Sequence, residues 1–169
     1  MVKFFRIISL ILLFCWMVFI FLLSSQNASD SSNTSAGFIS SFMRLFYPDF
    51  ETLTLVKQLE FVGSLQFFVR KAAHFTIYGI LGGFSFFSFI TYKGLKPYLR
   101  LLISLSVCLV YSITDEIHQL FVVGRSGEIR DVCIDFCGSL LAVAILYFMV
   151  KFSRFNGVLK YEKKRTIKT

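Results

Sequence analysis

Four long apolar runs, separated by shorter polar segments, dominate the chain. They predict membrane-spanning helices over residues 5–23, 70–92, 98–123 and 131–150, because about 20 apolar residues in a helix cross the hydrocarbon core of a bilayer. The first run could instead be the apolar region of a signal peptide, with Ala28 as a small residue for cleavage. Such regions usually contain about 7–15 residues, whereas residues 7–23 form an apolar run of 17. We therefore favour a retained anchor.

The segment between the first two runs has a different pattern. Residues 24–35 are rich in Ser, Asn, Gln and Asp, which predicts an exposed loop. Residues 37–47 and 52–68 carry apolar residues at helical spacing, and Pro48-Asp49 separates them. These two stretches predict amphipathic helices that lie on the membrane surface or pack on the bundle. The predicted fold class is therefore all-α, a multi-pass membrane protein with four transmembrane helices plus amphipathic helices in the first outer loop.

Composition supports a membrane protein and changes how the charge is interpreted. Hydrophobic residues make up 56% of the 169 residues, charged residues only 17%, and the mean hydropathy is +0.70. Soluble domains average roughly 45–50% apolar and 25% charged residues. The formal net charge of +8 could suggest nucleic-acid binding, but the basic residues gather at helix ends and in the tail. Membrane topology explains this distribution better, so we expect no nucleic-acid partner.

The distribution of Lys and Arg also predicts the orientation. Four spans place both termini on one side, together with the connection between the second and third spans. That side holds two basic residues at the N-terminus, three in residues 93–100 and seven in residues 151–169, which is 12 of the 18. By the positive-inside rule, both termini are cytoplasmic in the cell membrane. We expect a membrane domain over residues 1–150 and a basic cytoplasmic tail over residues 151–169.

Polar residues interrupt three of the spans at what this topology predicts to be one outer level. Ionisable groups are expensive in hydrocarbon and usually mark a site or a network that holds helices together. The predicted ligand-binding set is Arg70, Lys71, His74, Tyr78, Asp115, Glu116, Gln119, Arg125, Asp131 and Asp135. Four bases in this region, Arg70, Lys71, Arg125 and Arg130, could neutralise the four acids. A network without any ligand would therefore also explain the pattern.

The sequence does not favour a metal or another cofactor. His74, Asp115, Glu116, His118, Asp131 and Asp135 could all supply oxygen or nitrogen ligands. However, His118-Gln119 lacks the spacing that places two histidines on one helical face, and no thiolate cluster lies near the histidines. We interpret the four cysteines as small apolar packing residues. We therefore expect no metal and no cofactor.

The polar motifs also resemble a known family. The order Arg70-Lys71-x-x-His74-Phe75-x-x-Tyr78, then Asp115-Glu116-x-His118-Gln119-x-Phe121, then Gly124-Arg125 and Asp131-x-x-x-Asp135-x-x-Gly138 resembles the VanZ-like family, named after a teicoplanin-resistance protein. Phe21-x-x-Ser24-Ser25-Gln26 is similar as well, so the resemblance covers about residues 5–150. Val123 stands where the family often has Pro, and Asp135 where Asn is common. The resemblance implies a small multi-pass membrane protein, linked in some members to glycopeptide resistance.

Three functions remain open. The first is binding, at the outward-facing site, of an anionic headgroup, a cell-wall intermediate or a glycopeptide, because Arg and Lys grip phosphate and carboxylate groups. The second is a membrane-embedded hydrolase or transferase acting on a lipid-linked substrate, with His74, Glu116 and Asp115 as catalytic candidates. The third is a structural or partner-binding membrane protein without a ligand. The lipid bilayer is the expected surrounding, and the sequence indicates no oligomeric state.

Overall fold

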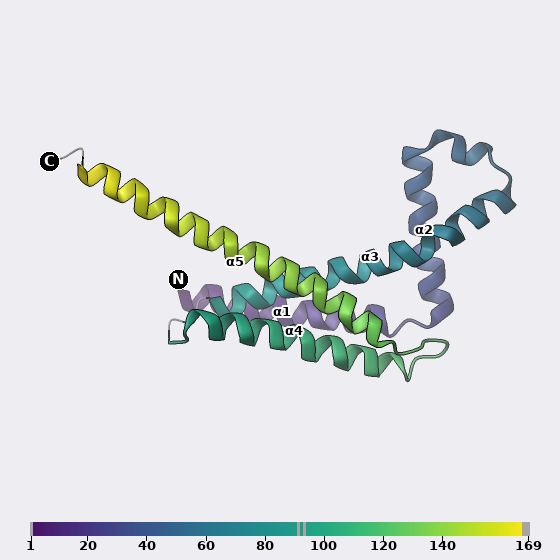
Figure 1. The fold of residues 1–169 in the computed structure, drawn as a ribbon. Helices are drawn as coiled ribbons and strands as arrows, with labels where there is room; N and C mark the ends of the chain where they lie inside the picture. Colours follow the sequence, from purple (N-terminus) through teal and green to yellow (C-terminus); the bar gives the residue numbers. More distant parts are fainter. Residues whose placement is uncertain (1, 91, 93, 167–169) are drawn as a thin grey trace.

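The computed structural model describes residues 2–90, 92 and 94–166. It contains five α-helices and one 3₁₀ helix within these residues, and the described part contains no strand. The elements are α1 (Val2–Ser24), α2 (Ala28–Phe46), η1 (Pro48–Thr52), α3 (Leu55–Ile90), α4 (Pro97–Gln119) and α5 (Ile129–Thr166) (Figure 1). The all-α fold class is confirmed.

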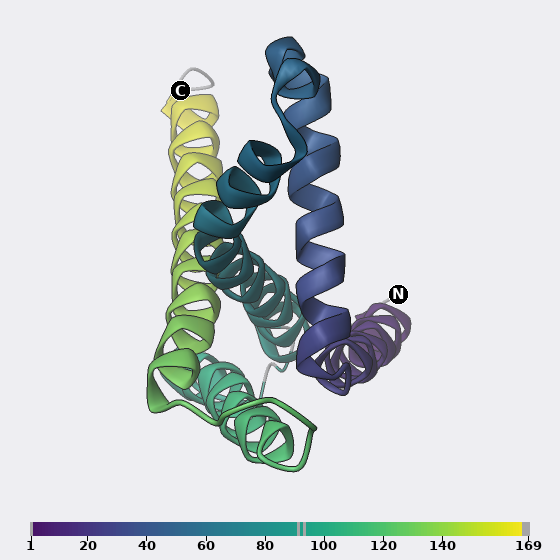
Figure 2. The same cartoon turned by 90° about the vertical axis from the view of Figure 1, so that its right-hand side faces the viewer.

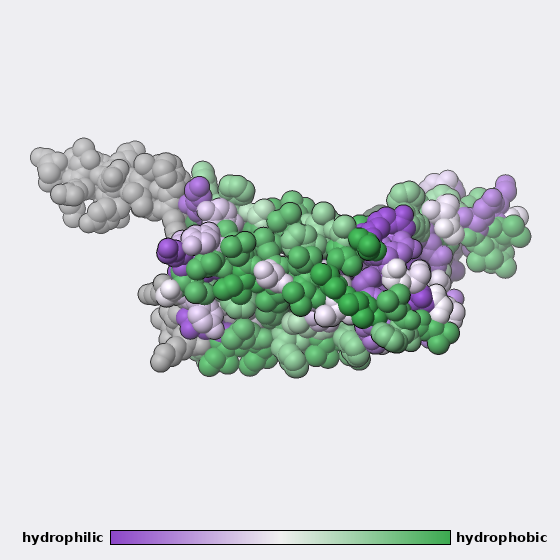
Figure 3. Space-filling view, turned by 60° about the horizontal axis from the view of Figure 1, so that its bottom comes forward, coloured by the Kyte–Doolittle hydropathy of each residue, from purple (hydrophilic) through white to green (hydrophobic). Residues whose placement is uncertain are grey.

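Four of these helices are long and apolar enough to cross a membrane. The candidate spans are Phe4–Ser24, Leu55–Ile90, Pro97–Gln119 and Ile129–Ser153. A hydrophobic surface covers the middle of the bundle in Figure 3, and polar residues gather toward its two ends. This is the distribution that a bilayer requires, since hydrocarbon meets the middle and water meets the ends. The chain is a multi-pass membrane protein.

The two ends of the bundle differ in structure. One end holds the N-terminus and the connection between α3 and α4, and α5 continues beyond it (Figure 1). The opposite end holds residues 25–54 and the connection 120–128, and we call it the hairpin end. There α2 stands across the bundle axis, as Figure 2 shows, and returns through η1 to the start of α3. Ile39, Phe50 and Val62 form a small buried cluster that holds this hairpin together.

The expectation of an exposed loop over residues 24–35 is wrong beyond Asn27. Asn27 caps α2, because its side-chain oxygen accepts a hydrogen bond from the backbone N–H of Asp30 at 2.9 Å. The hydroxyls of Thr34 and Ser35 donate to backbone carbonyls of the preceding turn. Gln66 of α3 also donates to the carbonyl of Ser32 at 2.7 Å. Capping and tertiary contacts therefore make this polar segment helical.

The other helix boundaries also differ from those that the apolar runs predict. Residues 52–68 and 70–92 were expected as two helices, but α3 is one helix of 36 residues. The described part of the tail continues α5, which has 38 residues. The third span ends at Gln119, before residue 123, because residues 120–123 form a turn. At 1.5 Å per residue α3 is about 54 Å long, so it extends well beyond the hydrocarbon core.

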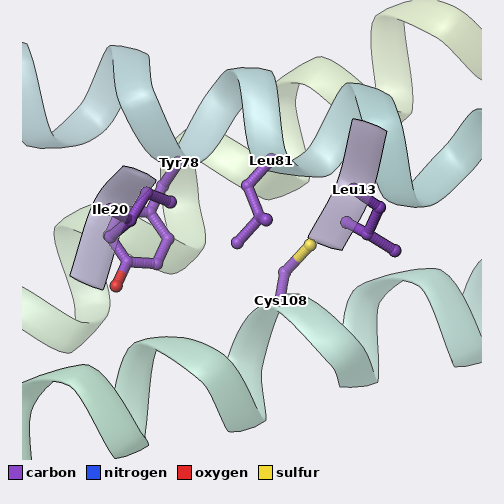
Figure 4. Close-up of a cluster of buried hydrophobic side chains, with 5 residues drawn as sticks. All are labelled: Leu13, Ile20, Tyr78, Leu81 and Cys108. Carbon is purple, nitrogen blue, oxygen red and sulfur yellow. The ribbon is translucent and has the colours of Figure 1, made fainter. Parts of the chain in front are cut away.

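The bundle core lies where α3 packs between α1 and α4. Leu13, Ile20, Tyr78, Leu81 and Cys108 form its buried cluster, and Figure 4 shows the Tyr78 hydroxyl pointing towards α4. Hydrogen bonds fasten the helices in the same region. The indole of Trp16 donates to the carbonyl of Ile77 at 3.0 Å, and the hydroxyl of Ser85 donates to the backbone carbonyl of Ser104 at 3.0 Å. These contacts fix how α3 is rotated, and hence where its polar residues face.

A close crossing of α3 and α5 fixes the register of the remaining polar residues. A Cβ atom at Gly138 would lie 2.1 Å from the carbonyl oxygen of Phe75, and one at Gly82 would lie 2.7 Å from that of Ser139. Only glycine allows such an approach of two helix backbones. The hydroxyl of Ser139 donates to the carbonyl of Tyr78 at 2.8 Å across the same contact. The crossing therefore aligns the hairpin-end halves of α3 and α5.

Candidate functional site

Successive turns of α3 present polar side chains to α5 at the hairpin end. Lys71 and His74 are spaced i, i+3, and Asp131 and Asp135 are spaced i, i+4, so each pair shares a helix face. The Lys71 ammonium forms an ion pair with the Asp131 carboxylate. One turn further into the bundle, Nδ1 of His74 lies 3.4 Å from Oδ1 of Asp135. Two bases of α3 thus meet two acids of α5.

Asp135 is the most deeply buried of the acids, at 0% exposure. Its contact with His74 has the distance of an ion pair but not the geometry of a hydrogen bond, and no described residue forms a hydrogen bond with either carboxylate oxygen. Burial of such a group is costly unless it has a partner. The His74–Asp135 contact is therefore the main polar contact that this carboxylate has within the described residues.

The two adjacent acids of α4 have separate partners. The Tyr78 hydroxyl donates to Oδ2 of Asp115 at 2.9 Å, and the amide of Gln119 lies 3.5 Å from the same oxygen. Oε1 of Glu116 instead accepts the backbone N–H of Glu128 at 2.6 Å. Both carboxylates are buried, at 4% and 6% exposure. The acidic pair is therefore held by neutral donors, namely a tyrosine hydroxyl, a side-chain amide and a backbone N–H.

Connection 120–128 places Arg125 beside this acidic pair. Gly124 has φ of 75°, in the left-handed region that favours glycine, and allows the sharp turn just before Arg125. The backbone N–H of Ala28 donates to the carbonyl of Val123 at 3.2 Å, so this connection is tied to the start of α2. Together with the Glu116 contact to Glu128, these interactions fix both ends of the segment that carries Arg125.

The arginines fall into two groups. Arg130 forms an ion pair with Glu128 at 2.7 Å on the surface. Arg125 is half-buried, and its hydrogen bonds among the described residues go to neutral acceptors, at 3.2 Å to the Gln26 carbonyl and 3.3 Å to Oε1 of Gln119. Arg70 is also half-buried, and among the described residues it has no hydrogen bond or ion pair. Burial, and next the charge of Arg70, lower the pKa of the Arg125 guanidinium, and they outweigh the opposite effect of the nearby carboxylates of Asp115, Glu116 and Asp131.

Two cavities meet at Arg70 and Arg125. A polar cavity of about 400 Å³ lies between α3 and the connection 120–128, and its lining includes Gln66, Lys71 and Asp131. A larger, mainly apolar groove of about 640 Å³ lies between α1, α2 and α3. Arg70, His74 and Arg125 line both. The two arginines without a carboxylate partner therefore stand at the junction between a polar space and an apolar one.

We compared the chain with known protein families, with curated proteins and with solved structures. A family model described as VanZ/LLP1 matches residues 9–151. The chain belongs to the VanZ/LLP1 family. Comparisons with curated proteins and with solved structures gave no match.

This match confirms the resemblance to the VanZ-like family that the sequence motifs indicated. The ten predicted site residues lie in the half of the bundle nearer the hairpin end, where Tyr78 reaches into the bundle core, but they do not form one cluster. Lys71, His74, Arg70 and Arg125 border the polar cavity, whereas Glu116 is buried against the connection 120–128. Tyr78 and Asp115 line the apolar groove.

His118 lies apart from the other candidate ligands of this VanZ/LLP1 chain. Its ring stacks on Phe21 with 4.6 Å between centroids, and its Nε2 lies 3.1 Å from the hydroxyl of Ser25. It therefore faces α1, away from the His74–Asp135 contact. Within the described residues, no group of three or more His, Cys, Asp or Glu side chains could hold a metal ion.

Sequence reasoning did not include Gln66 and Glu128 among the site residues. Gln66 precedes Arg70 by four residues, so it shares the face of α3 that lines the polar cavity, and helical spacing could have indicated it. Glu128 holds Arg130 with its side chain and Glu116 with its backbone N–H. Its backbone role has no signal in the sequence, because any residue other than proline could supply that N–H.

Proposed function

We propose that this VanZ/LLP1 protein binds an anionic group in its polar cavity. The observation that carries the proposal is the pair of half-buried guanidiniums, Arg70 and Arg125, without a carboxylate in ion-pair contact. Partly buried charges normally have partners, and arginine presents a fork of donors that matches phosphate and carboxylate oxygens. A bound anion would supply the missing charge and relieve the repulsion between the two groups.

The pattern of ion pairs argues against a network that is purely structural. Such a network would use the four acids to neutralise the four bases of this region. Instead, Asp131 and Asp135 form ion-pair contacts with Lys71 and His74. The acids of α4 accept hydrogen bonds from neutral donors. The two arginines that border both cavities are therefore left for another anion.

We further propose that the hairpin end faces the outside of the cell, with both termini in the cytoplasm, because basic residues are concentrated at the opposite end. A site at the outer surface would meet lipid headgroups, cell-wall intermediates or a glycopeptide. The protein would thereby contribute to envelope physiology or to teicoplanin-type resistance, as the family name suggests.

The test compares Arg70→Gln with Arg44→Gln in the purified protein. Arg44 is exposed on α2, pairs with Glu51 at 3.6 Å and lines neither cavity. Loss of charge-assisted hydrogen bonds costs about 1.5–3 kcal/mol, so Arg70→Gln should weaken phosphate binding roughly 10- to 150-fold. Arg44→Gln should bind phosphate like the wild type. Equal affinity in both variants would refute the proposal and favour a structural role.

A second candidate is a hydrolase or transferase that uses the same cavity. His74 lines both cavities, is 28% exposed at its side chain, and its Nδ1 faces the buried Asp135. A carboxylate at one ring nitrogen can orient the other as a general base. If His74 were only structural, His74→Asn would lower stability. If it were catalytic, the variant would retain phosphate binding and protein abundance, yet lose turnover of a lipid-linked phosphate.

A further inference from the structure

The apolar groove is continuous in its lining with the polar cavity, and this junction restricts the kind of ligand that fits. Three side chains, Arg70, His74 and Arg125, contribute to both walls. A small soluble anion would fill the polar part alone and leave the groove of about 640 Å³ without an occupant. Ligand sites of roughly 300–1,000 Å³ usually have mostly apolar walls with a few convergent polar groups.

Three of the hydroxyl-bearing residues that line the groove have their hydroxyls occupied within their own helices. Thr34 and Ser35 of α2 donate their hydroxyls to carbonyls of their own helix. Thr76 of α3 does the same to Ala72, at 2.8 Å. These hydroxyls are therefore satisfied internally and present mainly carbon atoms. The small side chains at positions 72, 73 and 76 leave room beside α1.

The groove also lies where a lipid chain is available. Ile20 and Leu23 of α1 and Ile77 of α3 belong to helices that cross the membrane, and all three line the groove. Arg70 and Arg125 stand nearer the hairpin end, where headgroups lie. An amphiphile would thus place its charged group and its chain in the order that the bilayer already imposes on lipids.

We propose that the ligand is a phosphate-bearing lipid, with its phosphate between Arg70 and Arg125 and its hydrocarbon chain in the groove between α1, α2 and α3. This proposal rests on anion binding at the same arginines. It adds that the chain of the ligand is recognised, which separates a lipid phosphate from free phosphate or a soluble headgroup.

The test uses a matched pair of substitutions, Thr76→Phe and Thr114→Phe. Both threonines are exposed on membrane-spanning helices and donate their hydroxyls to a carbonyl of the preceding turn, at 2.8 Å in each case. Only Thr76 lines the groove. Ala73→Leu fills the same groove with a smaller change and serves as a second variant if Thr76→Phe does not fold.

Binding of long-chain phosphatidic acid, of diacylglycerol with the same chains and of glycerol 3-phosphate is measured on the purified full chain. Thr76→Phe should weaken phosphatidic acid binding at least tenfold and leave glycerol 3-phosphate binding unchanged, whereas Thr114→Phe should behave like the wild type. Arg70→Gln should weaken both phosphates.

Three outcomes would overturn the inference, and they have different meanings. If filling the groove does not change phosphatidic acid binding while Arg70→Gln weakens both phosphates, the anion site stands and the chain site fails. If diacylglycerol binds as tightly as phosphatidic acid, the arginines have no part in lipid recognition. If Arg70→Gln leaves glycerol 3-phosphate binding unchanged, the proposed anion site itself is refuted, and the lipid site with it.

Discussion

Gly138→Ala should separate the two helices that carry most of the site. The added Cβ would lie 2.1 Å from the carbonyl oxygen of Phe75, whereas real Cβ atoms essentially never approach closer than 3.0 Å. The helices must therefore move apart by about 0.9 Å at this point. A gap of about 0.5–1 Å forfeits a quarter to a half of the dispersion energy of the atoms that face it.

Two further terms enter the free energy of unfolding. The same movement would lengthen the 2.8 Å hydrogen bond from Ser139 to the Tyr78 carbonyl beyond its usual range, at a cost of about 0.5–1.5 kcal/mol. Overpacking a tight contact costs about 1–3 kcal/mol, and the better helix propensity of alanine returns about 1 kcal/mol. We expect a net loss of about 2 kcal/mol.

Gly83→Ala provides the matched control. Its Cβ would meet only the Leu146 side chain at 3.7 Å, an ordinary contact, so its propensity gain should leave it neutral or slightly more stable. Equilibrium unfolding of the purified protein in mixed micelles measures both variants against the wild type. If Gly138→Ala lies within about 0.5 kcal/mol of Gly83→Ala, the close crossing does not hold α3 and α5 together.

Three other experiments test the site frame, the core and the orientation. Glu116→Ala should weaken phosphate binding, because it loosens the connection that carries Arg125. Glu116→Gln should retain most of the binding, because an amide oxygen can still accept the N–H of Glu128. Phosphate-binding assays with both variants test this. Trp16→Phe removes a hydrogen bond from α1 to α3 and should cost about 0.5–1.5 kcal/mol in the same unfolding assay. In a variant lacking the native cysteines, Asn33→Cys should react with an impermeant thiol reagent from outside intact cells and Thr166→Cys should not; the reverse would invert the proposed orientation.

The long apolar runs were sufficient to predict the spans, because hydropathy over about 20 residues reports directly on the bilayer. Helical spacing likewise indicated that Lys71, His74 and Tyr78 lie on successive turns of one helix. Neither signal could show that α2 begins at Ala28. That depends on the cap by Asn27 and on contacts with α3, and a serine-rich segment has a weak preference of its own.

The pairing of charges was beyond what the sequence could predict. A count of bases and acids treats the charges as interchangeable, whereas the structure assigns them by register. The close approach at Gly82 and Gly138 sets α5 against α3, and this register brings Asp131 to Lys71. Glycines in a span indicate close packing, but they do not say which helix is the partner or at which residue the two cross.

The acidic stretch of α4 therefore supports the arginine that borders both cavities. Glu116 and Gln119 hold the connection 120–128, through the backbone of Glu128 and the side chain of Arg125, while Asp115 receives the hydroxyl of Tyr78. If these buried acids formed ion pairs with Arg70 and Arg125, the arginines would have no free donors for a ligand. Because these acids bind neutral donors instead, they can fix the position of the Arg125 segment without forming an ion pair with its guanidinium. A site built in this way leaves the guanidinium donors of Arg70 and Arg125 without a carboxylate contact and therefore accessible to an anion in the cavity.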